Sequence, residues 1–291
     1  MAAECATTAI TRMARLLEVS TSGFYKRVKR SATTELSDRE QRKADLTVKI
    51  IDHHRESAGV YGSPRITADL RAAGEVVSEK TVAKIMAEIG LVGISPRTFK
   101  VRTTIVDPTA SFPADLVKRQ FDQGRCDAVW SSDITYLTCG EGDMYLCALR
   151  DEHSKRVLGW SVADHMLTEL VTDALAQAVA VRDGNVRGTI MHSDRGAQFT
   201  AQAMARACAE AGLRRSMGAT GICWDNSGAE SLWSTFKHEY YYRHVFGTKT
   251  ELVAAVDKWM NYYNNQRRHS AIGMLSPISY EQSLNAASQA A

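Results

Sequence analysis

Over the first ninety residues, apolar positions recur every three or four residues, a spacing that predicts helices. Residues 9–30 hold two short helical patterns joined at 18–20, within a first unit over 1–36. Ser20 or Ser22 can cap the second helix. The exposed side of that helix is expected to carry Tyr25, Lys26, Lys29 and Arg30. This is the layout of a helix-turn-helix, and a simple packing unit fits the pattern equally well.

A second helical unit is predicted over 37–102. Pro64 suits the first turn of its middle helix, and Ser78 suits the N-cap of its last helix. The buried sides of its helices are marked by Leu46, Val48, Ile50, Ile51, Val82, Ile85, Met86 and Ile89. The outer side of the last helix then presents Lys80, Thr81 and Lys84. These residues form either a solvated face or a set of contacts to a DNA groove.

The rest of the chain has the pattern of one α/β domain. Residues 103–115 carry two of the five prolines and few signs of regular structure, so we place a linker at 103–120. The domain is predicted over 121–285, with a tail at 286–291. Strands are predicted at 128–138, 144–151, 157–164, 188–192 and 213–217. Helices are predicted at 169–182, at 201–211, and from about 228 and 249. This order predicts a mixed sheet with helices on both faces.

Composition narrows the class of protein. The chain has 291 residues, of which 44% are hydrophobic and 24% charged, the balance of a globular protein with two or three domains. It has no apolar run of membrane-spanning length and no signal-peptide pattern, so we expect a cytoplasmic location and no membrane contact. Its six cysteines form no C-x-x-C pair, and His53 and His54 lack matching cysteines, so we expect no zinc site.

The charge is distributed unevenly along the chain. Residues 1–110 contain 18 Lys and Arg against 13 Asp and Glu, whereas the remainder contains 18 against 20. Lys and Arg bind DNA by neutralising phosphates and releasing counterions. The N-terminal part is therefore the better candidate for DNA contacts, although a solubilising surface also explains the excess.

Three acidic residues stand out in the predicted α/β domain. Asp133 lies inside a predicted strand, where Asp is depleted, and Asp194 follows an apolar strand. Glu230 follows Asp194 with thirty-five residues between them. Each acid also has an ordinary structural explanation. Asp133 fits an exposed strand position, Asp194 fits a turn, and Glu230 fits a capping box at 227–230. Together, three carboxylates from separate elements favour a site for two divalent cations, since magnesium prefers oxygen ligands.

The helix predicted from about 228 has two different sides. At about 100° per residue, its apolar side carries Leu232, Trp233, Phe236 and Tyr240. Its polar side carries Glu230, Ser234, Lys237 and Tyr241. Lys237 lies two turns after Glu230 and points in nearly the same direction. One face thus combines a metal ligand with a phosphate contact.

The amino-acid sequence around these acids closely resembles the catalytic signature of DDE transposases and retroviral integrases. The matching segments are W-S-S-D-I-T-Y around Asp133, H-S-D-R-G-A-Q-F around Asp194, and D-N-S-G-A-E ending at Glu230. The resemblance implies a ribonuclease H-like integrase core preceded by helix-turn-helix units. It also implies that the three acids bind two Mg²⁺ or Mn²⁺ ions and that Lys237 contacts DNA near the reacting end.

A C-terminal segment extends this resemblance to the second-reading-frame transposases of bacterial insertion sequences. It reads Y-N-x-x-R-x-H from Tyr263, and its Arg267, Arg268 and His269 are candidates for phosphate contacts. The resemblance implies binding to terminal inverted repeats, nicking at the 3′ end and strand transfer on the bacterial nucleoid. It further implies a homo-oligomer on DNA and an upstream-frame helix-turn-helix protein as fusion or partner.

Two other functions remain open from the sequence. A tyrosine recombinase is suggested by Tyr262 and Tyr263 beside the Arg267–His269 cluster. It would form a phosphotyrosyl adduct without magnesium. A DNA-binding regulator derived from a transposase would bind the same repeats with an idle core.

Overall fold

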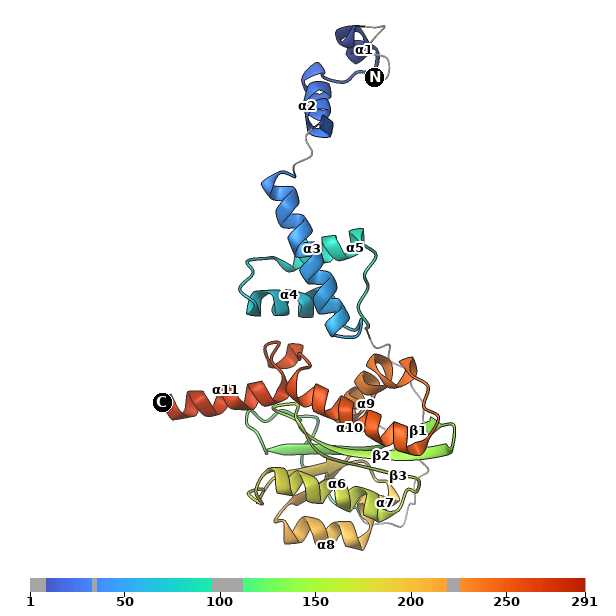
Figure 1. Cartoon of the computed structure of the whole chain (residues 1–291). Helices are drawn as coiled ribbons and strands as arrows, with labels where there is room; N and C mark the ends of the chain where they lie inside the picture. The colour runs from blue at the N-terminus through green and yellow to red at the C-terminus, as the bar shows by residue number, and fades with distance from the viewer. Residues whose placement is uncertain (1–8, 33–35, 96–111, 219–225, 291) are drawn as a thin grey trace. The chain divides into compact units, whose positions relative to one another are not determined.

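The computed structural model describes residues 9–32, 36–95, 112–218 and 226–290 (Figure 1). The chain divides into two compact units, 1–92 and 93–291. Within the described residues, we find no helix with the length and apolar character needed to cross a bilayer.

The first two helices of the N-terminal unit are short. Helix α1 spans Ile10–Leu16 and helix α2 spans Thr21–Ala32. Ser20 caps α2, because its Oγ accepts a hydrogen bond from the Gly23 N–H at 3.0 Å. Lys26 and Lys29 are exposed on α2, as the helical pattern predicted.

Three further helices pack together in the same unit. They are α3 at Asp38–Glu56, α4 at Ser63–Ala72 and α5 at Glu79–Glu88. Ser78 caps α5 by accepting from the Thr81 N–H at 3.2 Å, which confirms that prediction. Their shared core contains Leu46, Ile50, Ile66, Leu70, Val82, Ile85 and Met86.

Three residues predicted to be buried in this unit are exposed. Val48 and Ile51 lie on the outer side of α3, because α4 and α5 pack against one narrow stripe of it. Ile89 follows the last residue of α5 and lies past the packed part of that helix. Lys80, Thr81 and Lys84 are exposed on α5, as predicted.

The second unit is built on a five-stranded sheet with strand order β3-β2-β1-β4-β5. The strands are β1 at Val129–Cys139, β2 at Gly142–Asp151, β3 at Val157–Ala163, β4 at Ile190–Ser193 and β5 at Arg214–Met217. Strands β1, β2 and β3 pair antiparallel, whereas β4 and β5 run parallel to β1 and to each other. The predicted mixed sheet is confirmed.

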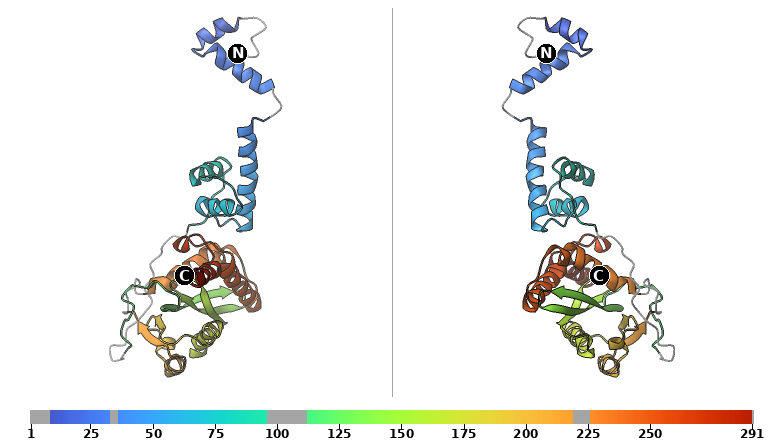
Figure 2. Two further views of the ribbon diagram at one scale, coloured as in Figure 1. Left: turned by 90° about the vertical axis from the view of Figure 1, so that its left-hand side faces the viewer. Right: turned by 90° about the vertical axis from the view of Figure 1, so that its right-hand side faces the viewer.

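Helices cover both faces of this sheet (Figure 1, Figure 2). Helices α6 (Thr168–Val181) and α8 (Gln202–Glu210) pack on one face, where Trp130 belongs to the core. Helices α9 (Ser227–Glu239) and α10 (Lys249–Asn265) pack on the other, where Leu137 belongs to the core. The short elements are α7 at Ala197–Thr200, η3 at Tyr241–Arg243 and η4 at Ser270–Ile272. Because side chains alternate along a strand, Asp133 falls on the α9 side with Leu137.

The ends of the predicted domain differ from expectation. Much of the linker predicted at 103–120 lies outside the described residues. Its last part packs on the core, since Val117 is buried with Val129 and Ile190. At the other end, helix α11 runs from Pro277 to Ala290, so the predicted tail at 286–291 is helical as far as Ala290. Its alanine-rich sequence has high helix propensity.

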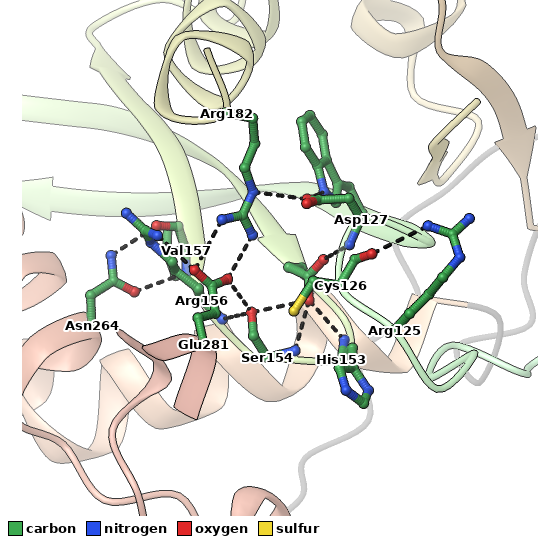
Figure 3. Close-up of polar contacts among 12 residues, drawn as sticks. Arg125, Cys126, Asp127, His153, Ser154, Arg156, Val157, Arg182, Asn264 and Glu281 are labelled. Atoms are coloured by element: carbon green, nitrogen blue, oxygen red, sulfur yellow. Dashed lines mark hydrogen bonds and ion pairs between the residues drawn. The ribbon is translucent and has the colours of Figure 1, made fainter. Parts of the chain in front are cut away.

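Buried polar contacts fasten the start of α11 to the sheet (Figure 3). Glu281 accepts hydrogen bonds from Arg182 at 2.6 and 2.9 Å, from Arg156 at 2.6 Å and from Ser154 at 2.8 Å. Arg182 also pairs with Asp127 at 2.9 Å. The C-terminal helix is thereby tied to the end of α6 and to the turn between β2 and β3.

Candidate active site

Asp133 and Asp194 are brought together by two neighbouring parallel strands. Asp133 lies within β1 opposite Ala148 of β2, and Asp194 directly follows β4. The β1–β4 register pairs Ser131 with His192. Asp133 and Asp194 each follow this pair by two residues, and the charge of Asp194 acts on the pKa of Asp133. The two aspartates therefore lie near one another at the carboxyl end of β4.

The environment of both aspartates favours their neutral forms. Burial, together with the charges of Asp194 and Glu230, raises the pKa of Asp133 to about 7. The Ile134 N–H, which donates to Asp133 Oδ1 at 2.9 Å, opposes this change. Burial also raises the pKa of Asp194, while the Gly196 N–H, donating at 3.0 Å, opposes that change. When neighbouring carboxylates repel one another, binding a proton or a cation relieves the repulsion.

Glu230 lies in the first turn of α9, which begins at Ser227. The N-cap residue is Asn226, and its side chain forms no capping hydrogen bond. The capping box considered for 227–230 is therefore wrong. Glu230 is exposed, burial raises its pKa, and its charge acts on Asp133. Leu232, Trp233 and Phe236 are buried on the apolar side of α9, as the helix phase predicted.

Two buried polar atoms beside the acids lack complete partners. Trp233 Nε1 is close enough to Asp133 to lower its pKa, but the contact misses hydrogen-bond geometry. Asn226 Oδ1 has no hydrogen-bond partner among the described residues, while Asn226 Nδ2 donates to the Ser132 carbonyl at 3.4 Å. Buried polar groups without partners are rare, and they mark positions where a ligand or an ordered water can bind.

The acidic donors fit divalent cations in chemistry. They supply oxygen ligands from three elements, and the charges of Asp194 and Glu230 add to burial in raising the pKa of Asp133. In the described parts of the chain, however, no three His, Cys, Asp or Glu side chains lie close enough together to hold a metal ion. The structure thus shows that the charges of Asp194 and Glu230 act on Asp133, while the three side chains are not gathered into one set of metal ligands.

Lys237 lies on the same side of α9 as Glu230 and is half-buried. Burial lowers its pKa, and the nearby Asp133 carboxylate opposes that change. Its positive charge therefore reaches the acidic site, where it can contact a phosphate group.

Arg267 does not occupy the position expected of a phosphate contact. Its side chain is 3% exposed, and its Nε and Nη2 donate to the Glu239 carboxylate, both at 2.7 Å. That expectation is wrong because the bidentate ion pair holds the guanidinium inside the core. Arg268 and His269 are half-buried; Arg268 donates to the Met274 carbonyl at 2.9 Å.

The tyrosines of the same segment are poor nucleophiles. Tyr263 is fully buried, and its hydroxyl is 2.9 Å from His269 Nε2. Burial raises the pKa of the Tyr263 phenol. Tyr262 is half-buried, and its hydroxyl oxygen is buried. The structure thus gives no support to a tyrosine recombinase.

A buried polar group near the acids was missed by the sequence analysis. Ser131, Arg150 and Glu152 are buried together on the α9 side of the sheet, and both Ser131 and Arg150 donate to Glu152. Charged residues at the end of an otherwise apolar predicted strand could have indicated this group. So could the position of Ser131, two residues before Asp133 and on the same face.

Comparison with known proteins places the two units in families. Two descriptions of the integrase core domain match residues 125–223 and 211–277, and an HTH-like domain matches residues 40–99. The transposase for insertion sequence element IS629 of Shigella sonnei is 35% identical over 266 residues, covering 91% of this chain and 88% of that protein. Transposase InsF for insertion sequence IS3A of Escherichia coli (strain K12) is 33% identical over 275 residues, covering 94% and 93%.

Among solved structures, the HTLV-2 integrase catalytic core domain in complex with magnesium is similar to this chain. It has a TM-score of 0.36 and 17% sequence identity, and the match covers 50% of this chain and 92% of that one.

Proposed function

Because this chain belongs to the insertion-sequence transposases with an integrase core domain, we propose that it acts at the ends of its own element. It binds the terminal inverted repeats, nicks the DNA at the 3′ end, and transfers that 3′-hydroxyl to a target phosphodiester. The observation that supports this proposal is that the charges of Asp194 and Glu230, which come from two other parts of the chain, both act on Asp133.

In this proposal, Asp133, Asp194 and Glu230 hold two Mg²⁺ or Mn²⁺ ions. When bound, such ions stabilise charge on the attacking and leaving oxygens and activate water or a 3′-hydroxyl. The oxygen donors, and the charges of Asp194 and Glu230 that act on Asp133, support this assignment. Bound cations would offset the mutual repulsion of the three carboxylates, which would favour their approach to one another.

The protein's own groups prepare this site. The Ile134 N–H orients Asp133, and the Gly196 N–H orients Asp194. Each carboxylate must release any proton it holds before it can serve as a ligand. Lys237 lies close enough to Asp133 for the Asp133 charge to act on its pKa. It binds the phosphate adjoining the reacting end.

DNA contacts outside the acidic site come from two sources in this proposal. Lys80 and Lys84 on α5, together with Lys26 and Lys29 on α2, are exposed on helices of the N-terminal unit. Exposed lysines bind phosphates and so supply affinity without sequence information. In the core unit, Arg268 and His269 remain the candidates for additional phosphate contacts.

The proposal includes partners and a location. Both ends of an element must be held for strand transfer, which calls for a homo-oligomer on DNA. An upstream-frame helix-turn-helix protein, as fusion or partner, would add to end recognition. The substrate places the enzyme on the bacterial nucleoid in the cytoplasm.

A strand-transfer assay with labelled element ends tests the function. The wild-type protein should release and join the 3′ end in Mg²⁺ and stop when EDTA is added, with and without the upstream-frame protein present. Asp194→Ala should bind the same DNA without cutting it. A regulator with an idle core predicts that the wild type also binds without cutting, and a tyrosine recombinase predicts a covalent protein–DNA adduct in EDTA.

A further inference from the structure

Helix α9, which carries both Glu230 and Lys237, is fastened at its C-terminal end by a buried ion pair. Glu239 is the last residue of the helix, and both Glu239 and Arg267 are almost fully buried. Arg267 donates two hydrogen bonds of 2.7 Å to the Glu239 carboxylate. Two parallel hydrogen bonds fix the relative orientation of the groups as well as their distance.

A second buried ion pair meets the N-terminal end of the same helix. Arg150 donates to both carboxylate oxygens of Glu152 at 3.0 Å. The Glu152 carboxylate rests directly against the backbone of Gly228 in the first turn of α9. A Cβ at Gly228 would lie 2.7 Å from the Glu152 carboxylate carbon, so only glycine allows this approach. A carboxylate is also electrostatically favoured at the N-terminal end of a helix.

Glu152 is linked to the strand that bears Asp133 as well as to α9. Ser131 Oγ donates to Glu152 Oε1, and the Glu152 N–H donates to the Val129 carbonyl at 3.0 Å. Ser131 lies two residues before Asp133 on the same face of β1. One carboxylate therefore touches both elements whose acids must meet, β1 with Asp133 and α9 with Glu230.

Tyr263 lies between the two ion pairs and interacts with the arginine of each. The Arg267 guanidinium lies over its ring, 5.6 Å from the centroid, and the charge of Arg150 acts on its phenol. The neighbouring Asn264 ties α10 to β3, accepting from the Val157 N–H at 2.9 Å and donating to the Val157 carbonyl at 2.8 Å. Tyr263, Asn264 and Arg267 of the Y-N-x-x-R-x-H segment are thus buried side chains that connect α10 and the following residues to α9 and the sheet.

Buried ion pairs are costly to desolvate, and well-packed apolar residues often serve stability as well or better. Two such pairs at the two ends of one helix therefore indicate a role in holding that helix in position. We propose that Glu152 and Glu239, with their partners Arg150 and Arg267, form a supporting frame of positioning residues that set Glu230 relative to Asp133 for metal binding. This inference rests on the proposed function, because it assigns a task to the frame of that same site.

Isosteric substitutions test the role, with a matched control in the same unit. Glu152→Gln and Glu239→Gln each remove one charge from the frame. Glu281→Gln does the same in the Arg182–Glu281 ion pair that fastens α11, where the Glu281 carboxylate accepts from Ser154, Arg156 and Arg182 and from no residue of β1 or α9 among the described contacts (Figure 3). For each protein, the folded fraction is measured by circular dichroism. Mn²⁺ binding without DNA is measured by electron paramagnetic resonance, and the Mg²⁺ concentration for half-maximal cleavage is measured with element ends.

We expect Glu152→Gln and Glu239→Gln to weaken Mn²⁺ binding and raise the half-maximal Mg²⁺ concentration about tenfold per folded molecule, the usual size of an effect from residues that support metal ligands. Glu281→Gln should lose stability alone and keep wild-type metal dependence. If a frame variant folds too poorly to assay, Gly228→Ala gives the same test, because its new methyl group displaces the first turn of α9 from Glu152.

Two outcomes separate the failure of this inference from the failure of the proposed function. Frame variants that keep wild-type Mn²⁺ binding and Mg²⁺ dependence per folded molecule, like Glu281→Gln, overturn the positioning role. A wild-type protein that binds no Mn²⁺ and cuts no more than Asp194→Ala overturns the proposed function itself.

Discussion

Asp133 in β1 and Asp194, the residue directly after β4, each lie two positions beyond the paired Ser131 and His192 of these parallel strands. This relationship brings together two acids that have sixty residues between them in the chain. It also explains why their pKa values are raised, because the site is partly buried and Asp194 disfavours the charge of Asp133.

The raised pKa of Asp133 predicts how the metal-free protein responds to pH. The folded protein keeps a proton that the unfolded chain releases near pH 3.8, so stability falls as pH rises from about 4 to about 7. The full effect is on the order of 4 kcal/mol. Asp133→Asn should remove this loss and unfold at higher denaturant concentration than the wild type at pH 8, with little difference at pH 4.

Chemical unfolding in EDTA at several pH values measures that difference. Adding Mg²⁺ at pH 8 should stabilise the wild type more than Asp133→Asn, because a ligand that binds the folded state raises its stability. Parallel pH profiles for the two proteins would contradict the assignment.

Arg267→Ala should destabilise the fold strongly. The substitution leaves the Glu239 carboxylate buried without its partner, at a cost of about 3–5 kcal/mol. Arg268→Ala, which removes a hydrogen bond to the Met274 carbonyl, should cost only about 1 kcal/mol. Urea unfolding of both variants checks the contrast. Equal stability of the two variants, with weaker DNA binding by Arg267→Ala, would instead return Arg267 to the DNA surface.

Gly228→Ala should reduce activity more than stability. Alanine favours a helix over glycine by about 1 kcal/mol, which offsets part of the cost of overpacking against Glu152. The displaced first turn still carries Glu230 away from Asp133. Ser227→Ala, one residue earlier, adds no bulk and serves as control. We expect cleavage by Gly228→Ala to fall about tenfold or more while its unfolding midpoint stays near that of the control.

Lys80→Ala and Lys84→Ala should weaken DNA binding by the N-terminal unit in a salt-dependent way. Removing one lysine–phosphate interaction reduces the slope of log K against log salt by about 0.9. Arg55→Ala removes the same charge from α3, where Arg55 pairs with Asp52 at 2.5 Å, and should leave that slope unchanged. Fluorescence anisotropy with inverted-repeat DNA at several salt concentrations distinguishes a groove contact from a solvated face.

Much of the architecture could be predicted from local patterns. The alternation along β1, the apolar stretch of β4 and the helical phase of α9 place Asp133, Asp194 and Glu230 on three separate elements. These signals are readable because strand and helix periods are properties of the local chain. Burial was harder to predict, as Val48 and Ile51 on α3 show, since an amphipathic pattern does not say how wide the packed stripe is.

The sequence by itself predicted the kind of chemistry, through the identity and spacing of three acids and a lysine, and it determined the elements that carry them. The tertiary structure alone decided which charges face the site and which are hidden. Arg267 and Glu239 lie twenty-eight positions apart yet meet inside the core, whereas Arg268 beside them stays half-buried. The reason is physical: the packing of whole helices and strands decides which charged residues meet. The residues adjacent to a charged residue in the chain do not reveal that packing.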